Sequence, residues 1–146
     1  YNDRPAYKDL LCYWAGYFEE AAASGIFRHH IHDGKYLTNN PSELLDRLYQ
    51  FKYFLSVVFL LPCFFYNSQE AFWTKDVCIS RIRDDRILSP ESQAFLDQCS
   101  TIRRKWGGLG TALSRDISVD FVQDMFHHAH RLCMEISKKA YAVPAS

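Results

Sequence analysis

The segment FLSVVFLLPCFFY, residues 54–66, is the most apolar run in the chain and constrains the fold more than any other. It has 13 residues and is interrupted by Pro62, whereas a helix needs roughly 20 apolar residues to cross a bilayer. A helix that is apolar on every side must be covered by neighbouring elements on every face. We therefore expect no membrane span and predict a buried helix at the centre of a bundle.

The ends of this central helix are predicted from local signals. Asn40 can accept hydrogen bonds from first-turn amides, Pro41 suits the first helical position, and Glu43 falls where a capping box places its acid. The helix is predicted to start at Pro41 and to end or kink at Pro62, because the proline ring removes a backbone hydrogen bond and clashes with the preceding turn. The apolar positions of its first half are Leu44, Leu45, Leu48 and Phe51.

Four further segments show helical periodicity, and no segment alternates as a strand does. They span residues 5–24, 67–82, 90–106 and 118–141, and residues 27–40 between the first two helices are predicted to be a polar loop. Gly25 is placed to end the first helix in a left-handed conformation, Asn67 or Ser68 to cap the third, and Ser89 with Pro90 to open the fourth, which Gly107 and Gly108 then end.

The expected core positions of these helices follow three- and four-residue steps. They are Tyr7, Leu10, Leu11, Trp14, Phe18, Ala21 and Ala22 in the first helix, Phe72, Trp73, Val77 and Ile79 in the third, Phe95, Cys99, Ile102 and Trp106 in the fourth, and Val119, Val122, Met125, Phe126, Ala129, Leu132, Cys133 and Ile136 in the fifth. The predicted fold is an all-α single domain, residues 1–146, with five main helices and the helix of residues 44–61 at its centre.

Charge and cysteine content limit the partners. Lys plus Arg and Asp plus Glu are both 17, so the formal net charge is zero, and this removes the general electrostatic argument for binding nucleic acid or an anionic membrane. Such a chain repels its copies weakly, which favours a homodimer or a larger host protein.

The five cysteines include no Cys-x-x-Cys pair, so we expect reduced, mostly buried thiols and a cytoplasmic protein. Because the chain begins with Tyr1, we expect a fragment of a larger chain.

The six histidines form two clusters. They are His29, His30 and His32 beside Asp33, and His127, His128 and His130 in the last helix. Successive helical residues are about 100° apart, so His127 is predicted opposite the apolar stripe, with His128 and His130 on its two flanks. Only His127 and His130 could share a ligand. No metal signature of fixed spacing is present, and we predict no metal and no cofactor.

A basic run beside an aromatic residue is the other candidate binding site. Arg103, Arg104, Lys105 and Trp106 close the fourth helix and could hold a phosphate or an RNA backbone. Cations in a last helical turn also interact favourably with the helix dipole, so the same run fits a purely structural role. The following Gly-Gly-Leu-Gly lacks the Lys-Ser/Thr of a phosphate-binding loop, and no nucleophile elbow occurs, so we do not expect an enzyme.

The segment STIRRKWGGLGTALSRDISVDFVQDMFHHAHRLCMEI, residues 100–136, resembles the HEPN superfamily of small helical bundles. In that family a helix ends in an arginine and a polar residue, a histidine follows a few residues later, and a long amphipathic helix comes next. Arg104, Lys105 and the helix from Ser118 match this layout, but positions 108–110 are Gly, Leu and Gly. The resemblance therefore implies an RNA-binding or RNase-related module without the catalytic histidine.

Three functions remain open at this point. From the residues we expect a non-catalytic helical interaction or regulatory module of a larger protein or assembly, whose partner is another protein or the rest of the parent chain. The HEPN resemblance implies RNA as partner. The last two helices are also similar to the ligand-binding part of TetR-type regulators, which implies a small-molecule-sensing domain with an apolar cavity beside the central helix.

Overall fold

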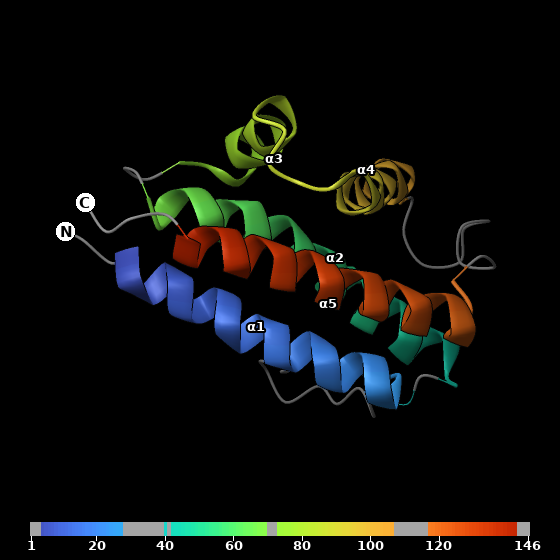
Figure 1. Cartoon of the computed structure of the whole chain (residues 1–146). Coiled ribbons are helices and arrows are strands. Elements are labelled where there is room, and N and C mark those ends of the chain that lie inside the picture. The colour runs from blue at the N-terminus through green and yellow to red at the C-terminus, as the bar shows by residue number, and fades with distance from the viewer. Residues whose placement is uncertain (1–3, 28–39, 41, 70–72, 107–116, 143–146) are drawn as a thin grey trace.

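The computed structural model describes residues 4–27, 40, 42–69, 73–106 and 117–142. These residues form five helices and no strand, which confirms the predicted all-α fold: α1 (Arg4–Ser24), α2 (Leu44–Asn67), α3 (Lys75–Asp84), α4 (Pro90–Lys105) and α5 (Val119–Ala142). Helices α1, α2 and α5 run alongside one another, and α3 and α4 lie across one side of this group (Figure 1).

Helix α2 is the central helix, as predicted, because it contacts each of the other four. Phe51, Phe54, Val58 and Leu61 are fully buried. One side of α2 is nevertheless open to solvent, so the expected cover on every face is incomplete. Lys52 and Ser56 are exposed there, and since residues four apart share one face of a helix, they mark a polar stripe on an otherwise apolar element.

The predicted start of α2 at Pro41 is wrong, although Pro41 itself lies outside the described residues. The helix begins at Leu44, and its cap residue Glu43 makes no side-chain capping bond. The side-chain oxygen of Asn40 accepts from the Ser42 N–H at 3.0 Å, and the Asn40 carbonyl accepts from the Glu43 N–H at 3.0 Å. Asn40 thus closes a separate turn before the helix. Leu44 and Leu45, expected in the core, are 46% and 51% exposed.

Of the predicted end or kink at Pro62, the end is wrong, because the helix continues to Asn67. Proline inside a helix costs about 3 kcal/mol. Burial of a large apolar side chain returns about 1.5–3 kcal/mol, and Phe64, Phe65 and Tyr66 are all buried beyond the proline. With these residues included, α2 is long and apolar enough to cross a membrane. Nevertheless, 67% of its most apolar 18-residue stretch is buried in the fold.

The beginning of α3 differs from the prediction. Asn67 and Ser68 belong to the end of α2, and α3 starts after Thr74, whose side chain accepts from the Val77 N–H at 3.4 Å. Asn67 instead ties the end of α2 to the residues just before α3, since its side-chain oxygen accepts from the Trp73 N–H at 2.7 Å. The predicted core stripe of this helix is wrong in part: Val77 is 47% exposed, the buried positions are Cys78 and Ile82, and Phe72 lies outside the described residues.

The remaining helix ends agree well with the sequence. Ser89 caps α4 by accepting from the Ser92 N–H at 3.3 Å, and Ser118 accepts from the Phe121 N–H at 3.1 Å before α5. Gly25 follows α1 with φ of +77°, a left-handed conformation that suits glycine. Trp106 is the C-cap residue of α4, and the glycines predicted to end that helix lie outside the described residues. The predicted stripe of α5 is buried except for Val119, which is 37% exposed.

Phe27 is a core residue that the sequence placed in a polar loop. It is fully buried, and its ring lies 5.0–6.1 Å from those of six aromatic residues. The turn at Gly25 brings the chain back over the bundle, and the Phe27 N–H donates to the side-chain oxygen of Gln50 at 3.2 Å. This residue therefore joins α1 to α2 and α5, which no periodic pattern could have shown.

Substitution of Val58 tests the central position of α2. Val58→Asp places an unpaired charge at a fully buried site, so we expect a loss of more than about 4 kcal/mol in unfolding free energy and no cooperative thermal transition. Ser56→Asp, at an exposed position of the same helix, is the matched control and should fold. Circular dichroism melting of both variants makes the measurement, and a cooperatively folded Val58→Asp variant would contradict the structure.

Substitution of Ser89 tests the cap of α4. Ser89→Ala removes the acceptor for the Ser92 N–H and should lower the unfolding free energy by about 1 kcal/mol in urea denaturation. Ser80→Ala, an exposed change inside α3, is the control and should be neutral or slightly stabilising, because alanine favours helix interiors. Equal stabilities of the two variants would show that Ser89 does not cap the helix.

Candidate functional site

A surface pocket between α2 and α4 sets two cations over an apolar floor. Its volume is about 260 Å³, and it is lined by Lys52, Leu55, Ser56, Phe59, Arg103 and Trp106. Leu55 and Phe59 are buried, whereas Lys52 and Arg103 are exposed. Among the residues that the structure describes, the lining contains no carboxylate. This site, called here the α2–α4 pocket, can therefore accept a group that is both apolar and negatively charged.

The end of α4 positions two of these residues. Trp106 follows the helix in an extended conformation, and its N–H still donates to the Arg103 carbonyl at 3.2 Å. The indole lies with its ring centre 6.3 Å from that of Phe51, so it is anchored against α2. The guanidinium carbon of Arg103 lies 4.9 Å from the centre of the Phe59 ring, a cation–π contact worth about 0.5–1 kcal/mol at an exposed site.

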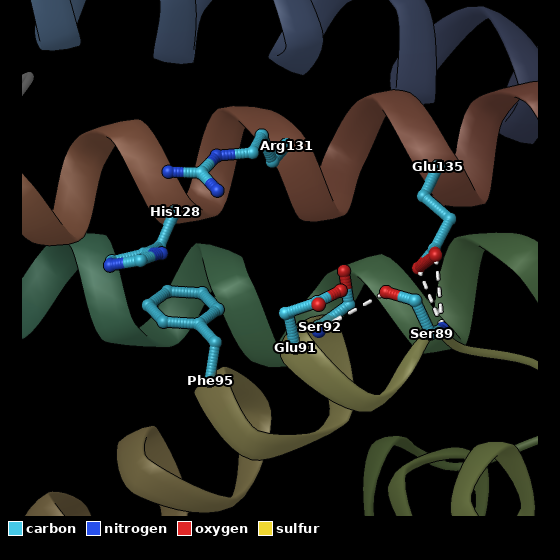
Figure 2. Close-up of a pocket in the computed structure, with 7 residues that line it drawn as sticks. All are labelled: Ser89, Glu91, Ser92, Phe95, His128, Arg131 and Glu135. Atoms are coloured by element: carbon cyan, nitrogen blue, oxygen red, sulfur yellow. Dashed lines mark hydrogen bonds between the residues drawn. The ribbon is translucent and has the colours of Figure 1, made fainter.

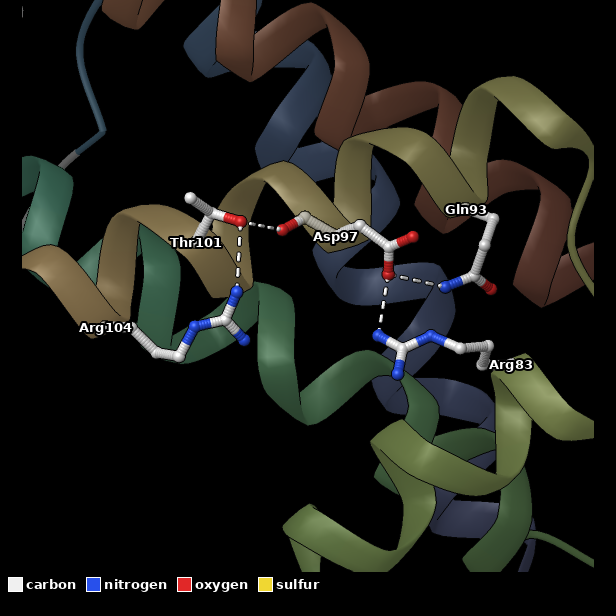
Figure 3. Close-up of polar contacts among 5 residues, drawn as sticks. All are labelled: Arg83, Gln93, Asp97, Thr101 and Arg104. Atoms are coloured by element: carbon white, nitrogen blue, oxygen red, sulfur yellow. Dashed lines mark hydrogen bonds and ion pairs between the residues drawn. The ribbon is translucent and has the colours of Figure 1, made fainter.

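The structure separates the four residues of the basic run. Only Arg103 and Trp106 line the pocket. Arg104 instead donates to the Thr101 hydroxyl at 3.2 Å, as part of a row of polar contacts along α4 (Figure 3). Lys105 is exposed and does not line the pocket.

Helix α2 contributes the second cation of the pocket, Lys52, which sequence reasoning missed. A signal was available, because Lys52 and Ser56 are polar residues four apart within a helix that is otherwise strongly apolar. Such a pair marks the side of a buried helix that reaches the surface.

The histidines of α5 face different neighbours. His127 is exposed. The ring of His128 stacks on Phe95 of α4 at 5.6 Å, and the Nε2 atom of His130 lies 3.5 Å from a carboxylate oxygen of Glu19 on α1. His29, His30 and His32 beside Asp33 lie outside the described residues. Within the part of the chain that the structure describes, no group of three or more His, Cys, Asp or Glu side chains could hold a metal ion.

A second pocket lies between the start of α4 and α5, with a volume of about 210 Å³ (Figure 2). Its lining consists of Ser89, Glu91, Ser92, Phe95, His128, Arg131 and Glu135. The Glu135 carboxylate accepts from the Ser89 N–H at 3.0 and 3.3 Å, and the Ser89 hydroxyl accepts from the Ser92 N–H. These groups join α4 to α5. Because the charges are mixed and these contacts are structural, the α2–α4 pocket is the stronger candidate.

The thiols fit no catalytic arrangement among the described residues. All five cysteines are free, as predicted, and three of them are buried. Burial raises the pKa of the Cys99 thiol, and it is the main cause that raises the pKa of Cys133 to about 12. Both therefore stay protonated at neutral pH, while nucleophilic attack needs the thiolate. Cys12 is the exposed thiol, and it donates to the Tyr141 hydroxyl at 3.5 Å.

The chain matches no protein-family model, and it has no significant match among curated proteins or solved structures. The HEPN and TetR resemblances therefore stay predictions.

Thiol labelling tests this assignment of the cysteines. At pH 8 the raised pKa keeps Cys99 and Cys133 neutral as well as buried, so N-ethylmaleimide should modify Cys12 first and these two only after unfolding. Mass spectrometry of digested samples over time measures the order. Cys12→Ser should remove the first modification, and labelling of Cys99 as fast as Cys12 would contradict the structure.

Proposed function

We propose that this chain is a non-catalytic helical interaction module and that a partner protein binds at the α2–α4 pocket. The observation that carries this proposal is the lining itself. Two exposed cations, Lys52 and Arg103, stand beside an apolar floor, and no acidic residue in the described part of the lining neutralises them. Such a lining is better explained by the binding of an external partner than by a role in stabilising the fold.

The chemistry of the pocket resembles that of energetically important interface sites. Tryptophan and arginine are the residues most enriched there, especially in small pockets that a partner side chain can fill. A volume of about 260 Å³ lies below the roughly 300–1,000 Å³ of small-molecule sites. The pocket thus fits a single anchoring side chain better than a drug-sized ligand, and this favours the interaction module over a small-molecule sensor.

The surface next to the pocket extends the same side of α2. Leu45 is 51% exposed and Tyr49 is 36% exposed. On a helix these two residues and Ser56 lie within one stripe, because steps of four and seven residues return to nearly the same direction. A partner seated in the pocket would therefore find further apolar contact area along α2.

RNA binding is the second candidate function. Three cations in the last turn of α4, followed by a partly exposed tryptophan, could contact phosphates and stack a base. With a formal net charge of zero, such binding would depend on this local cluster alone. The resemblance to HEPN domains supports it, and the missing histidine implies binding without cleavage.

Site-specific cross-linking tests the proposal. A photo-reactive p-benzoylphenylalanine at Ser56, in protein expressed in the cells that make it, should form one reproducible protein adduct. The adduct should weaken severalfold when Lys52→Glu and Arg103→Glu are added, because a reversed charge costs much of the electrostatic attraction.

The matched control carries the same photo-reactive group at Ser80, which is exposed on α3 and does not line the pocket. This variant should give no such adduct. An RNA adduct at Ser56 that Arg104→Ala weakens would favour the second candidate, and no adduct of either kind would contradict the proposal.

A further inference from the structure

We propose that the α2–α4 pocket binds an acidic peptide segment of the partner, which places a bulky apolar side chain on the pocket floor and a carboxylate against Lys52 and Arg103. This inference rests on the proposed function and adds the chemistry of the occupant. It follows from the charge of the lining, the nature of the floor and the size of the pocket.

The two cations of the pocket have no carboxylate partner among the residues that the structure describes. The Arg103 guanidinium contacts the Phe59 ring. Two arginines of α3 do have such partners, since Arg83 lies 2.7 Å from a carboxylate oxygen of Asp97 and Arg81 lies 3.2 Å from one of Asp85. An arginine that is left without an acid can bind an external carboxylate through two parallel hydrogen bonds.

The floor of the pocket gives this charge pair a favourable setting. Leu55 and Phe59 are 4% and 1% exposed, so an apolar group resting on them displaces water from a surface that is already mostly dry. The Trp106 indole forms part of the same lining and is partly exposed. With water displaced, a carboxylate beside Arg103 is attracted more strongly than at an open surface.

The same observations favour a peptide over RNA. Nucleic-acid affinity grows with the number of phosphates that a protein neutralises in a row. Here the lining contains two cations, Arg104 is bonded to Thr101, and Lys105 lies outside the pocket. A volume of about 260 Å³ accepts one side chain, and the exposed Leu45 and Tyr49 offer a path for the rest of a segment along α2.

Titration with a minimal probe tests the inference. N-acetyl-L-phenylalanine combines an aromatic ring with a carboxylate, and N-acetyl-L-phenylalaninamide is the neutral control. We expect the acid to shift the indole N–H signal of Trp106 saturably in two-dimensional NMR, with the signals of Trp14 and Trp73 unchanged. The amide should bind about tenfold more weakly, since it lacks the charge-assisted hydrogen bonds. Trp106→Phe assigns the signal.

Variants of the intact chain locate the binding site. Lys52→Gln and Arg103→Gln should each weaken binding of the acid severalfold, whereas Arg104→Gln, outside the lining, should bind like the natural chain. All three positions are exposed. Circular dichroism melting verifies that the variants fold. Equal loss in Arg104→Gln would mean that general charge, rather than the pocket, attracts the probe, and would overturn the inference.

Two further probes separate the alternatives. Inorganic phosphate that shifts Trp106 as strongly as the acid would indicate a simple anion site and overturn the inference. Oligouridylate that shifts Trp106 where the acid does not would indicate RNA. If the acid leaves Trp106 unchanged, or if acid and amide bind equally, the acidic segment is excluded. A protein adduct at Ser56 would still stand in that case. The acidic segment can thus be excluded while the proposal of an interaction module remains supported.

Discussion

The packing of aromatic rings around Phe54 is the interaction on which the rest of the structure depends. Its ring centre lies 5.0 Å from that of Phe126, 5.5 Å from Phe27 and 5.8 Å from Phe18. Because these residues come from α5, from the segment after α1 and from α1 itself, one cluster holds three helices together. Aromatic side chains bury large areas and prefer such tilted and edge-to-face arrangements. Which surface α2 leaves exposed between its neighbours depends on how this core packs.

Polar contacts then place the outer helices on this core. Glu135 of α5 holds the first turn of α4 through the Ser89 N–H, and Lys139 of α5 donates to the Ile87 carbonyl just before it. Figure 3 shows how Arg83 of α3 bonds Asp97 on the outer side of α4. Exposed pairs of this kind contribute little energy, but they are directional. They join the beginning and the middle of α4 to α5 and α3, while the C-terminal end of α4 lines the α2–α4 pocket.

The sequence predicted the fold class, the central helix, the Ser89 cap and the Gly25 turn, since each depends on neighbours within a few residues. An end of the helix at Pro62 was wrong, because tertiary burial of Phe64, Phe65 and Tyr66 offsets the local cost of proline. Of the candidate site it found Arg103 and Trp106 but grouped them with Arg104 and Lys105. Proximity in sequence is not proximity on a helix, because residues one step apart point in directions about 100° apart.

What the sequence by itself determined is the set of helices and the apolar stripes of α1, α4 and most of α5, because helical periodicity and capping are local. What only the tertiary structure decided is which faces meet. The burial of Phe27, the exposure of Leu44 and Leu45, and the meeting of Lys52 with Arg103 across two helices all depend on how the stripes pack. Burial of apolar area is non-directional, so the sequence shows that an apolar helix face will be covered. Only the packed core shows which helix covers it.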